Sequence, residues 1–178
     1  MKQLFYGGVP VPYTVSWSSE ASFFVDTCIH ARREAIVQNS DRGNGKPVFS
    51  KPHMNRQRET IAKCLCDLCG KSIRNSTKVS LSMARPQPHA KNFGDILQVE
   101  PLLHRKCAAT CVEHCPALKR QISDGMLNIR QVFSHGVQFA ILGDQGVFEV
   151  TGVRQKAIGH AKVHLKKWAD RDFEWLVK

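Results

Sequence analysis

The sequence predicts an α+β protein that is built around one cluster of cysteine and histidine residues. Three observations lead to this prediction. Six of the seven cysteines lie in two short stretches, CLCDLCG (64–70) and HRKCAATCVEHC (104–115). Segments rich in Val, Phe, Tyr and Trp, which favour strands, lie on both sides of these stretches. Two other segments repeat apolar residues at helical spacing.

The amino-terminal half divides into strands, a loop and a helix. Residues 3–17 contain one or two short strands, bent at adjacent glycines and at two prolines. Residues 20–37 are compatible with either a helix or a strand. The Asn, Asp, Gly and Pro content of residues 39–47 predicts a loop. A helix is expected over residues 52–65.

Strands and a helix are also expected through the middle of the chain. Residues 77–83 alternate as a strand does, and 95–100 are the expected pairing partner. The stretch HRKCAATCVEHC is interpreted as a helix that ends at Pro116. A polar connector follows.

The carboxyl-terminal third is expected to end in a helix. Before it, the segments VFSHGVQFAIL (132–142) and GVFEVTGV (146–153) are interpreted as strands. The helix is predicted over 154–168, because four apolar residues recur at spacings of three, four and three. They are Ile158, Ala161, Leu165 and Trp168.

The charge of the chain predicts an acidic partner. The formal net charge is +11, and nine basic residues stand against two acidic ones between residues 51 and 91. Residues 1–50 hold five basic and four acidic residues. A localised positive charge indicates affinity for polyanions, most often nucleic acid, and nothing indicates a small-molecule substrate.

Hydropathy indicates a cytoplasmic protein without a membrane partner. No apolar run approaches the ~20 residues that cross a bilayer. The amino terminus also lacks the unbroken apolar region of a secretory signal. Because disulfides are rare in the cytosol, clustered cysteines there point to metal binding.

Two pairs of residues have the spacing of metal ligands. Cys66 and Cys69 form a CxxC followed by Gly70, and the two-residue gap lets both sulfurs face one ion. His104 and Cys107 stand three residues apart, so they share one face of a helix. In a treble-clef zinc site, a turn that carries the first ligand pair is followed by two strands and by a helix that donates the second pair. We call the turn around Cys66 and Cys69 the knuckle. Three sulfurs and one nitrogen suit a closed, structural Zn²⁺ site.

The exact ligand set stays open from the sequence alone. Cys107, Cys111 and Cys115 recur at four-residue spacing beside His104, and Cys64 lies two residues before the knuckle. Cys115, Cys111 and Cys64 are therefore alternate ligands, and a four-sulfur set with Cys115 is the second choice. Cys28 stands alone and is interpreted as a small buried apolar side chain.

No catalytic constellation is evident, so the sequence predicts a protein that is not an enzyme. An HNH-type nuclease would need a water-activating histidine on a strand and a further metal ligand on the helix, and no convincing pair is present. His160 and His164 have the spacing of a zinc-protease motif, but Ala161 stands where that motif has glutamate. No phosphate-binding glycine loop or nucleophile elbow occurs.

The leading functional hypothesis is a module that binds DNA or RNA. Basic residues around the knuckle and at the start of the following helix are expected to contact phosphates, which makes binding salt-dependent. They are Arg56, Arg58, Lys63, Lys71, Arg74, Lys78, Arg105 and Lys106. The alternative is a protein-binding module, because the strand-rich residues 1–25 and 131–153 offer edges for pairing.

The expected organisation is a single packed unit with three parts. A strand-rich segment covers residues 1–50, and the zinc-binding, treble-clef-like module covers residues 51–120. Residues 121–178 supply further strands and the carboxyl-terminal helix.

Three blocks of the chain resemble a family of small uncharacterised proteins from actinobacteria and bacteriophages. The blocks are GVPVPYTVSWSSE, GKPVFSKPHMNRQRETIAKCLCDLCG and CAATCVEHCPALKR. Members typically show VPY…W-S-x-E, then RQR before CxxCG, then a CxxCA helix that ends in C-P-x-L. The matches span about residues 7–120 in scattered blocks.

The resemblance implies a zinc site in a phage or prophage protein, located in a bacterial host cell. It places the family's first cysteine pair on Cys66 and Cys69 and the second on His104 and Cys107, with His104 in place of the usual cysteine. It brings no established activity. A phage-encoded inhibitor of a host defence or nucleic-acid-processing complex is then one form of the protein-binding alternative.

Overall fold

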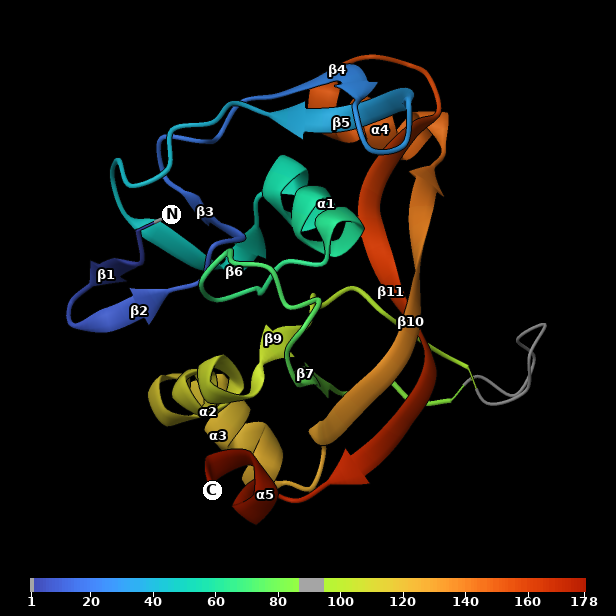
Figure 1. Cartoon of the computed structure of the whole chain (residues 1–178). Helices are drawn as coiled ribbons and strands as arrows, with labels where there is room; N and C mark the ends of the chain where they lie inside the picture. The colour runs from blue at the N-terminus through green and yellow to red at the C-terminus, as the bar shows by residue number, and fades with distance from the viewer. Residues whose placement is uncertain (1, 87–94) are drawn as a thin grey trace.

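The computed structural model describes residues 2–86 and 95–178 and shows an α+β protein with a mostly sheet core (Figure 1). The strands in these residues are β1 (Leu4–Tyr6), β2 (Val9–Val11), β3 (Val15–Trp17), β4 (Phe23–Cys28), β5 (Arg33–Gln38), β6 (Pro47–Pro52), β7 (Lys78–Ser82), β8 (Ile96–Gln98), β9 (Leu103–His104), β10 (Asn128–Leu142) and β11 (Ala157–Arg171). The helices are α1 (Met54–Lys63), α2 (Arg105–His114), α3 (Pro116–Ser123), α4 (Asp144–Thr151) and α5 (Phe173–Val177).

The two longest strands, β10 and β11, organise the fold. They pair antiparallel over almost their whole length and curve along one side of the molecule, from α4 at one end to α5 at the other (Figure 1). Their sheet has the order β4-β5-β11-β10-β7-β9, with β8 also paired to β11. Small two-stranded sheets, β1-β2 and β3-β6, lie on the opposite side of α1 from β10.

One hydrophobic cluster joins the middle of the chain to its carboxyl-terminal end. It contains buried residues from α1, α2, α5 and the central strands. Examples are Ile61, Val79, Ala108, Val132, Leu165 and Leu176. The metal-ligand segments and the long strands therefore share one core.

Helix α1 completes the central sheet with side chains. The amide group of Gln57 donates to the Ala161 carbonyl at 2.8 Å and accepts from the Ala161 N–H at 2.9 Å. Arg58 donates to the Gly159 carbonyl at 2.6 Å. Strand β5 meets β11 just before this point and β8 meets it just after. Between these two strands, the edge of β11 has no strand partner within the described residues. The Gln57 and Arg58 side chains satisfy the backbone groups of Ala161 and Gly159 there, which would otherwise stay unpaired.

The start of α1 anchors the amino-terminal strands. The Arg56 guanidinium donates to both carboxylate oxygens of the buried Glu20, each at 2.6 Å. His53 is the N-cap residue of α1, because its Nδ1 accepts from the Arg56 backbone N–H at 3.3 Å. Its Nε2 donates to the Asn39 carbonyl at 3.0 Å. Burial and the nearby charge of Arg56 lower the pKa of His53, and a neutral ring supplies the one acceptor and one donor that these bonds need.

The expected final helix over 154–168 is wrong, because this segment is strand β11. Ala161, Val163 and Leu165 are buried and alternate with the half-buried Lys162 and His164. That period of two is the pattern of a strand with one buried face. The carboxyl-terminal helix is the much shorter α5.

Two other sequence expectations are also wrong. Residues 146–153 belong mostly to helix α4, which ends at Gly152 with a φ of 75°, in the left-handed region that glycine tolerates. Strand β8, within the predicted strand 95–100, pairs with β11, whereas β7 pairs with β9 and β10. Strand pairing here joins segments far apart in the chain, which local patterns do not indicate.

Other elements agree with expectation or resolve an open choice. The helix expected over 52–65 is confirmed as α1, and the strand expected over 132–142 is confirmed as part of β10. Residues 20–37, compatible with helix or strand, hold β4 and most of β5. Pro116 ends α2 as expected but also begins α3 at a position where its missing N–H is harmless.

None of the helices in residues 2–86 and 95–178 combines the length and the apolar character needed to cross a membrane.

Candidate metal centre

Four side chains converge as the sequence predicts. One ligand atom from each of Cys66, Cys69, His104 and Cys107 lies within 4.8 Å of the others, an arrangement that could hold a metal ion. Cys66 is buried and the other three are half-buried. This is the one such group of three or more ligands in the described part of the chain.

A tight backbone turn presents Cys66 and Cys69. Leu65 and Ser72 form an isolated antiparallel bridge that closes the turn. Inside it, the Cys66 N–H donates to the Lys71 carbonyl at 2.8 Å, and the Gly70 N–H donates to the Cys66 carbonyl at 2.9 Å. Gly70 has a φ of 67°, which a side chain would disfavour. The glycine after the CxxC is therefore required by the backbone.

The second pair comes from the junction of β9 and α2. His104 ends β9 and is the N-cap position of α2, and Cys107 lies in the first turn of that helix. The His104 Nδ1 lies 3.5 Å from the Cys69 sulfur and 3.8 Å from the Cys107 sulfur. A tetrahedral zinc site, with Zn–S near 2.3 Å and Zn–N near 2.0 Å, has S···N edges of about 3.5 Å. The observed separations fit such a tetrahedron.

A backbone carbonyl orients the imidazole. The His104 Nε2 lies 3.1 Å from the Ser72 carbonyl oxygen, which can only accept a hydrogen bond. Nε2 therefore carries the proton, and Nδ1 faces the sulfurs with a free lone pair. Metal-binding histidines usually have a second bond of this kind. Sequence reasoning missed Ser72, because its contribution comes from the backbone and leaves no side-chain signal.

The electrostatics of the cluster favour a bound cation. Backbone N–H groups of Cys69 and His104 act to lower the pKa of Cys66, and that of Lys71 acts to lower the pKa of Cys69. Contact with Cys107 and burial raise the pKa of Cys66, and burial raises that of Cys69. Crowded thiols resist ionising together unless a cation lies between them. The donor set and its surroundings thus fit a soft or borderline metal ion.

The alternate cysteines lie outside this group. The Cys64 sulfur lies 3.8 Å from Nε2 of His135 in β10. Cys111 lies further along α2 and Cys115 is the C-cap residue of that helix, and burial raises the pKa of Cys111. Cys28 is buried with Ala35 and Ile158 in a separate small cluster.

Asp67, between the two knuckle cysteines, connects the site to distant segments. The Tyr13 N–H donates to the Asp67 carbonyl at 2.7 Å, and the Thr14 hydroxyl donates to the Asp67 carboxylate. The Asp67 N–H donates to the Leu102 carbonyl at 3.0 Å. Burial raises the pKa of the Asp67 carboxyl to about 6. The knuckle is therefore a meeting point of three parts of the chain.

Two of the expected phosphate contacts are wrong. Arg56 and Arg58 are 5% and 1% exposed, so neither side chain reaches a ligand at the surface. Arg56 pairs with Glu20, and Arg58 contacts the Gly159 carbonyl. The RQR segment is basic in composition, but its side chains are buried and form hydrogen bonds inside the protein.

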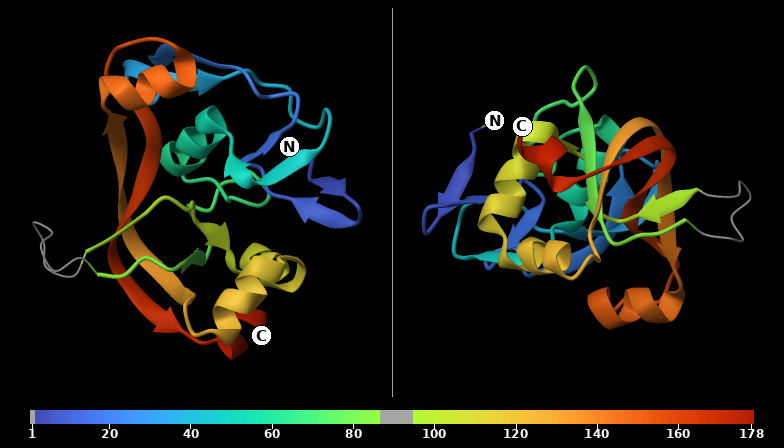
Figure 2. Two further views of the ribbon diagram at one scale, coloured as in Figure 1. Left: turned by 180° about the vertical axis from the view of Figure 1, so that it is seen from behind. Right: turned by 90° about the horizontal axis from the view of Figure 1, so that it is seen from below.

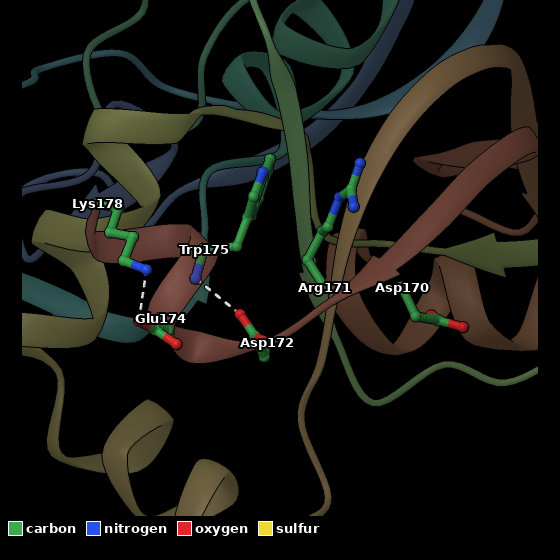
Figure 3. A pocket seen from close by; sticks show the side chains of 6 residues that line it. All are labelled: Asp170, Arg171, Asp172, Glu174, Trp175 and Lys178. Atoms are coloured by element: carbon green, nitrogen blue, oxygen red, sulfur yellow. Dashed lines mark hydrogen bonds and ion pairs between the residues drawn. The ribbon is translucent and has the colours of Figure 1, made fainter.

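Arg105 is also occupied, in a contact that holds α5 against α2. Its guanidinium lies 4.7 Å from the centre of the Trp175 ring and donates to the Trp175 carbonyl. Arg171 lies 5.3 Å from the same ring. Figure 3 shows Trp175 and Arg171 in a pocket of about 350 Å³, whose other lining groups carry charges of both signs. These mixed charges do not favour an anion.

The remaining basic side chains expected to contact phosphate differ in their exposure and in whether they already have a partner. Lys71, Arg74 and Lys106 are exposed. Lys78 is half-buried, and its ammonium group lies 3.3 Å from the Arg74 carbonyl. Lys63 is exposed but pairs with Glu59 at 2.6 Å.

Comparison of the chain with protein-family models, curated proteins and solved structures found no match. The resemblance to the actinobacterial and phage family therefore stays a prediction, and the metal centre is the feature that the structure itself supplies for a functional proposal.

Proposed function

We propose that this is a small structural-zinc protein that binds nucleic acid mainly through phosphate contacts beside its metal centre. The metal part of the proposal is supported by the donor set. Three thiolates and one imidazole prefer Zn²⁺ and complete its tetrahedral shell. With four protein ligands no position remains for a reactive water, so the ion would stabilise the fold.

The order of elements supports a treble-clef-like arrangement of the site. The knuckle comes first, then β7, β8 and β9, of which β9 pairs with β7, and then α2, which begins directly after His104. The first turn of α2 contributes Cys107. This order resembles the expected layout, except that β9 and not the expected strand 95–100 pairs with β7.

The observation that carries the nucleic-acid proposal is the placement of three exposed basic residues among the ligands. Lys71 follows Gly70 in the knuckle, and Lys106 stands between His104 and Cys107. Arg74 lies just after the knuckle closes. A metal ion that fixes the ligands would also fix these three charges relative to one another. Fixed, exposed cations suit a phosphate backbone and read no base sequence.

The test is the salt dependence of binding to DNA and RNA. Affinity for labelled duplex DNA and single-stranded RNA would be measured by fluorescence anisotropy over a range of salt concentrations. The plot of log K against log salt has a negative slope, and we expect a variant to show a slope that is less steep by about 0.9 for each contact to duplex DNA that it loses. The test variant replaces Lys71, Arg74 and Lys106 with Gln.

A matched control removes the same charge elsewhere. Lys46, Lys51 and Lys156 are exposed and lie away from the metal ligands in the sequence. Their joint replacement with Gln should change the slope much less. Equal slopes for the two triple variants would show that net charge alone drives binding, and no binding at low salt would refute the nucleic-acid proposal.

The protein-binding alternative predicts a different result in the same experiment. An apolar protein interface is weakly sensitive to salt, whereas phosphate contacts are strongly sensitive. A phage-encoded inhibitor of a host complex would bind that complex with an affinity that persists at high salt.

A further inference from the structure

Within the described part of the chain, strand β10 has an unpaired edge over most of its length. Strand β7 covers only Asn128–Val132. From residue 133 to 142, β10 pairs with β11 alone, and no other backbone hydrogen bond within residues 2–86 and 95–178 reaches this segment. We call residues 133–142 the open edge. It belongs to the outer of the two long strands near α4 (Figures 1 and 2).

The open edge lacks the features that usually protect such strands. Proteins discourage pairing at exposed edges with charged side chains and prolines. The thirteen residues between Arg130 and Asp144 contain neither, although the chain carries a net charge of +11. Phe133, Val137 and Ile141 are 49%, 39% and 52% exposed. An incoming strand would therefore cover apolar surface and meet no charged residue of the open edge itself, and the nearby Lys166 of β11, whose side chain lies over Gly136, would have to turn toward solvent.

The open edge is also symmetric about its centre. Its register with β11 is regular from His135 to Phe139 and irregular on either side. Val137 is the middle of that regular stretch, and Phe133 and Ile141 stand four residues to each side of it. Antiparallel pairing of two such edges about Val137 would place each His135 opposite Phe139 of the other copy, and would bring Phe133 of one copy to the same end of the seam as Ile141 of the other.

We propose that two copies of this chain associate by antiparallel pairing of their open edges, centred on Val137. A second copy fits better than an unrelated peptide because the edge is self-complementary. The two sheets would join into one continuous sheet. The inference does not depend on metal or nucleic-acid binding.

Sedimentation equilibrium of the full chain over micromolar to millimolar concentrations tests this association. Val137→Lys places two lysines directly opposite each other at the symmetry axis. Like charges across strands are destabilising, and we expect self-association to weaken by about tenfold or more. Val150→Lys on α4 is the matched control, because Val150 is also exposed and apolar but lies outside the open edge. It should associate as the unmodified chain does.

Charge reversal tests the register itself. Mixing Val137→Lys with Val137→Glu should restore association as a mixed dimer. The double variant Phe133→Lys with Ile141→Glu in one chain should associate more strongly than either of its single variants. Circular dichroism would confirm that each variant folds. A chain that stays monomeric at all concentrations overturns the proposal, and so does association unaffected by Val137→Lys or equally weakened by Val150→Lys.

Discussion

At the scale of single residues, the polar side chains of α1 act in the interior. His53, Arg56 and Gln57 are buried, and each forms hydrogen bonds with backbone or with a buried partner. Sequence patterns indicate the helix but not this role, because a basic, polar segment ordinarily faces solvent. Each buried group is compensated by a partner that is distant in sequence, either a carboxylate or the backbone of another segment. A local sequence pattern cannot reveal such a partner.

His53 should make stability fall as the solution becomes acidic. Its pKa is lowered in the folded protein, so the unfolded chain binds more protons between that value and about 6.5. The stability that the neutral ring contributes is present above about pH 6.5 and is lost as the pH falls below it. Urea unfolding between pH 5 and pH 8, at fixed zinc, measures this loss.

His53→Asn is the matched variant for that measurement. Asparagine can still cap α1 but does not titrate in this range. We expect the variant to lose less stability on acidification than the unmodified chain. Identical pH dependence in the two proteins would show that His53 does not contribute.

At the scale of elements, β11 shows where local periodicity fails. Ile158, Ala161, Leu165 and Trp168 fit a helical spacing, yet Ala161, Val163 and Leu165 fit a strand equally well. Pairing with β10 decides between the two patterns, because it satisfies the backbone of the segment along almost its whole length. The metal ligands were predictable from sequence because CxxC and HxxC impose their own local geometry.

Removing the side chain that fills the gap beside β11 should destabilise the protein measurably. Gln57→Leu keeps the volume but leaves the Ala161 N–H and carbonyl without partners, a loss of about 1–3 kcal/mol in the free energy of unfolding. Faster hydrogen exchange at Ala161 would locate the effect. Lys63→Gln on the exposed side of α1 should cost no more than about 0.5 kcal/mol. Equal effects would contradict the role given to Gln57.

At the scale of the whole molecule, the metal centre lies where distant segments meet. Its ligands flank Asp67, which binds Tyr13 from the amino-terminal segment and Leu102 before β9. Helix α2, which begins at the site, packs in the same core as α5 and the long strands. Loss of an ion there would weaken contacts well beyond the knuckle.

Metal removal should therefore destabilise the chain as a unit. We expect one zinc per chain, with binding energy on the order of 10 kcal/mol coupled to folding. Cys107→Ser should lose zinc and have a lower melting temperature. Cys115→Ser should keep the zinc content and the melting temperature of the unmodified chain. Metal analysis and thermal unfolding of both variants provide the measurement. Zinc loss in Cys115→Ser with retention in Cys107→Ser would instead support the four-sulfur set.

The contact between Gln57 and Ala161 has a consequence for how the chain is made. These residues are 104 positions apart. During synthesis α1 leaves the ribosome long before β11 exists, so Gln57 and Arg58 lack their partners on β11 until that strand appears. Arg56 and His53 already find Glu20 and Asn39 in the preceding part of the chain. Contacts of such long sequence separation form late. The folded state should thus be reached only after β11 has left the ribosome, and chains that stop before β11 should be substrates for chaperones and proteases.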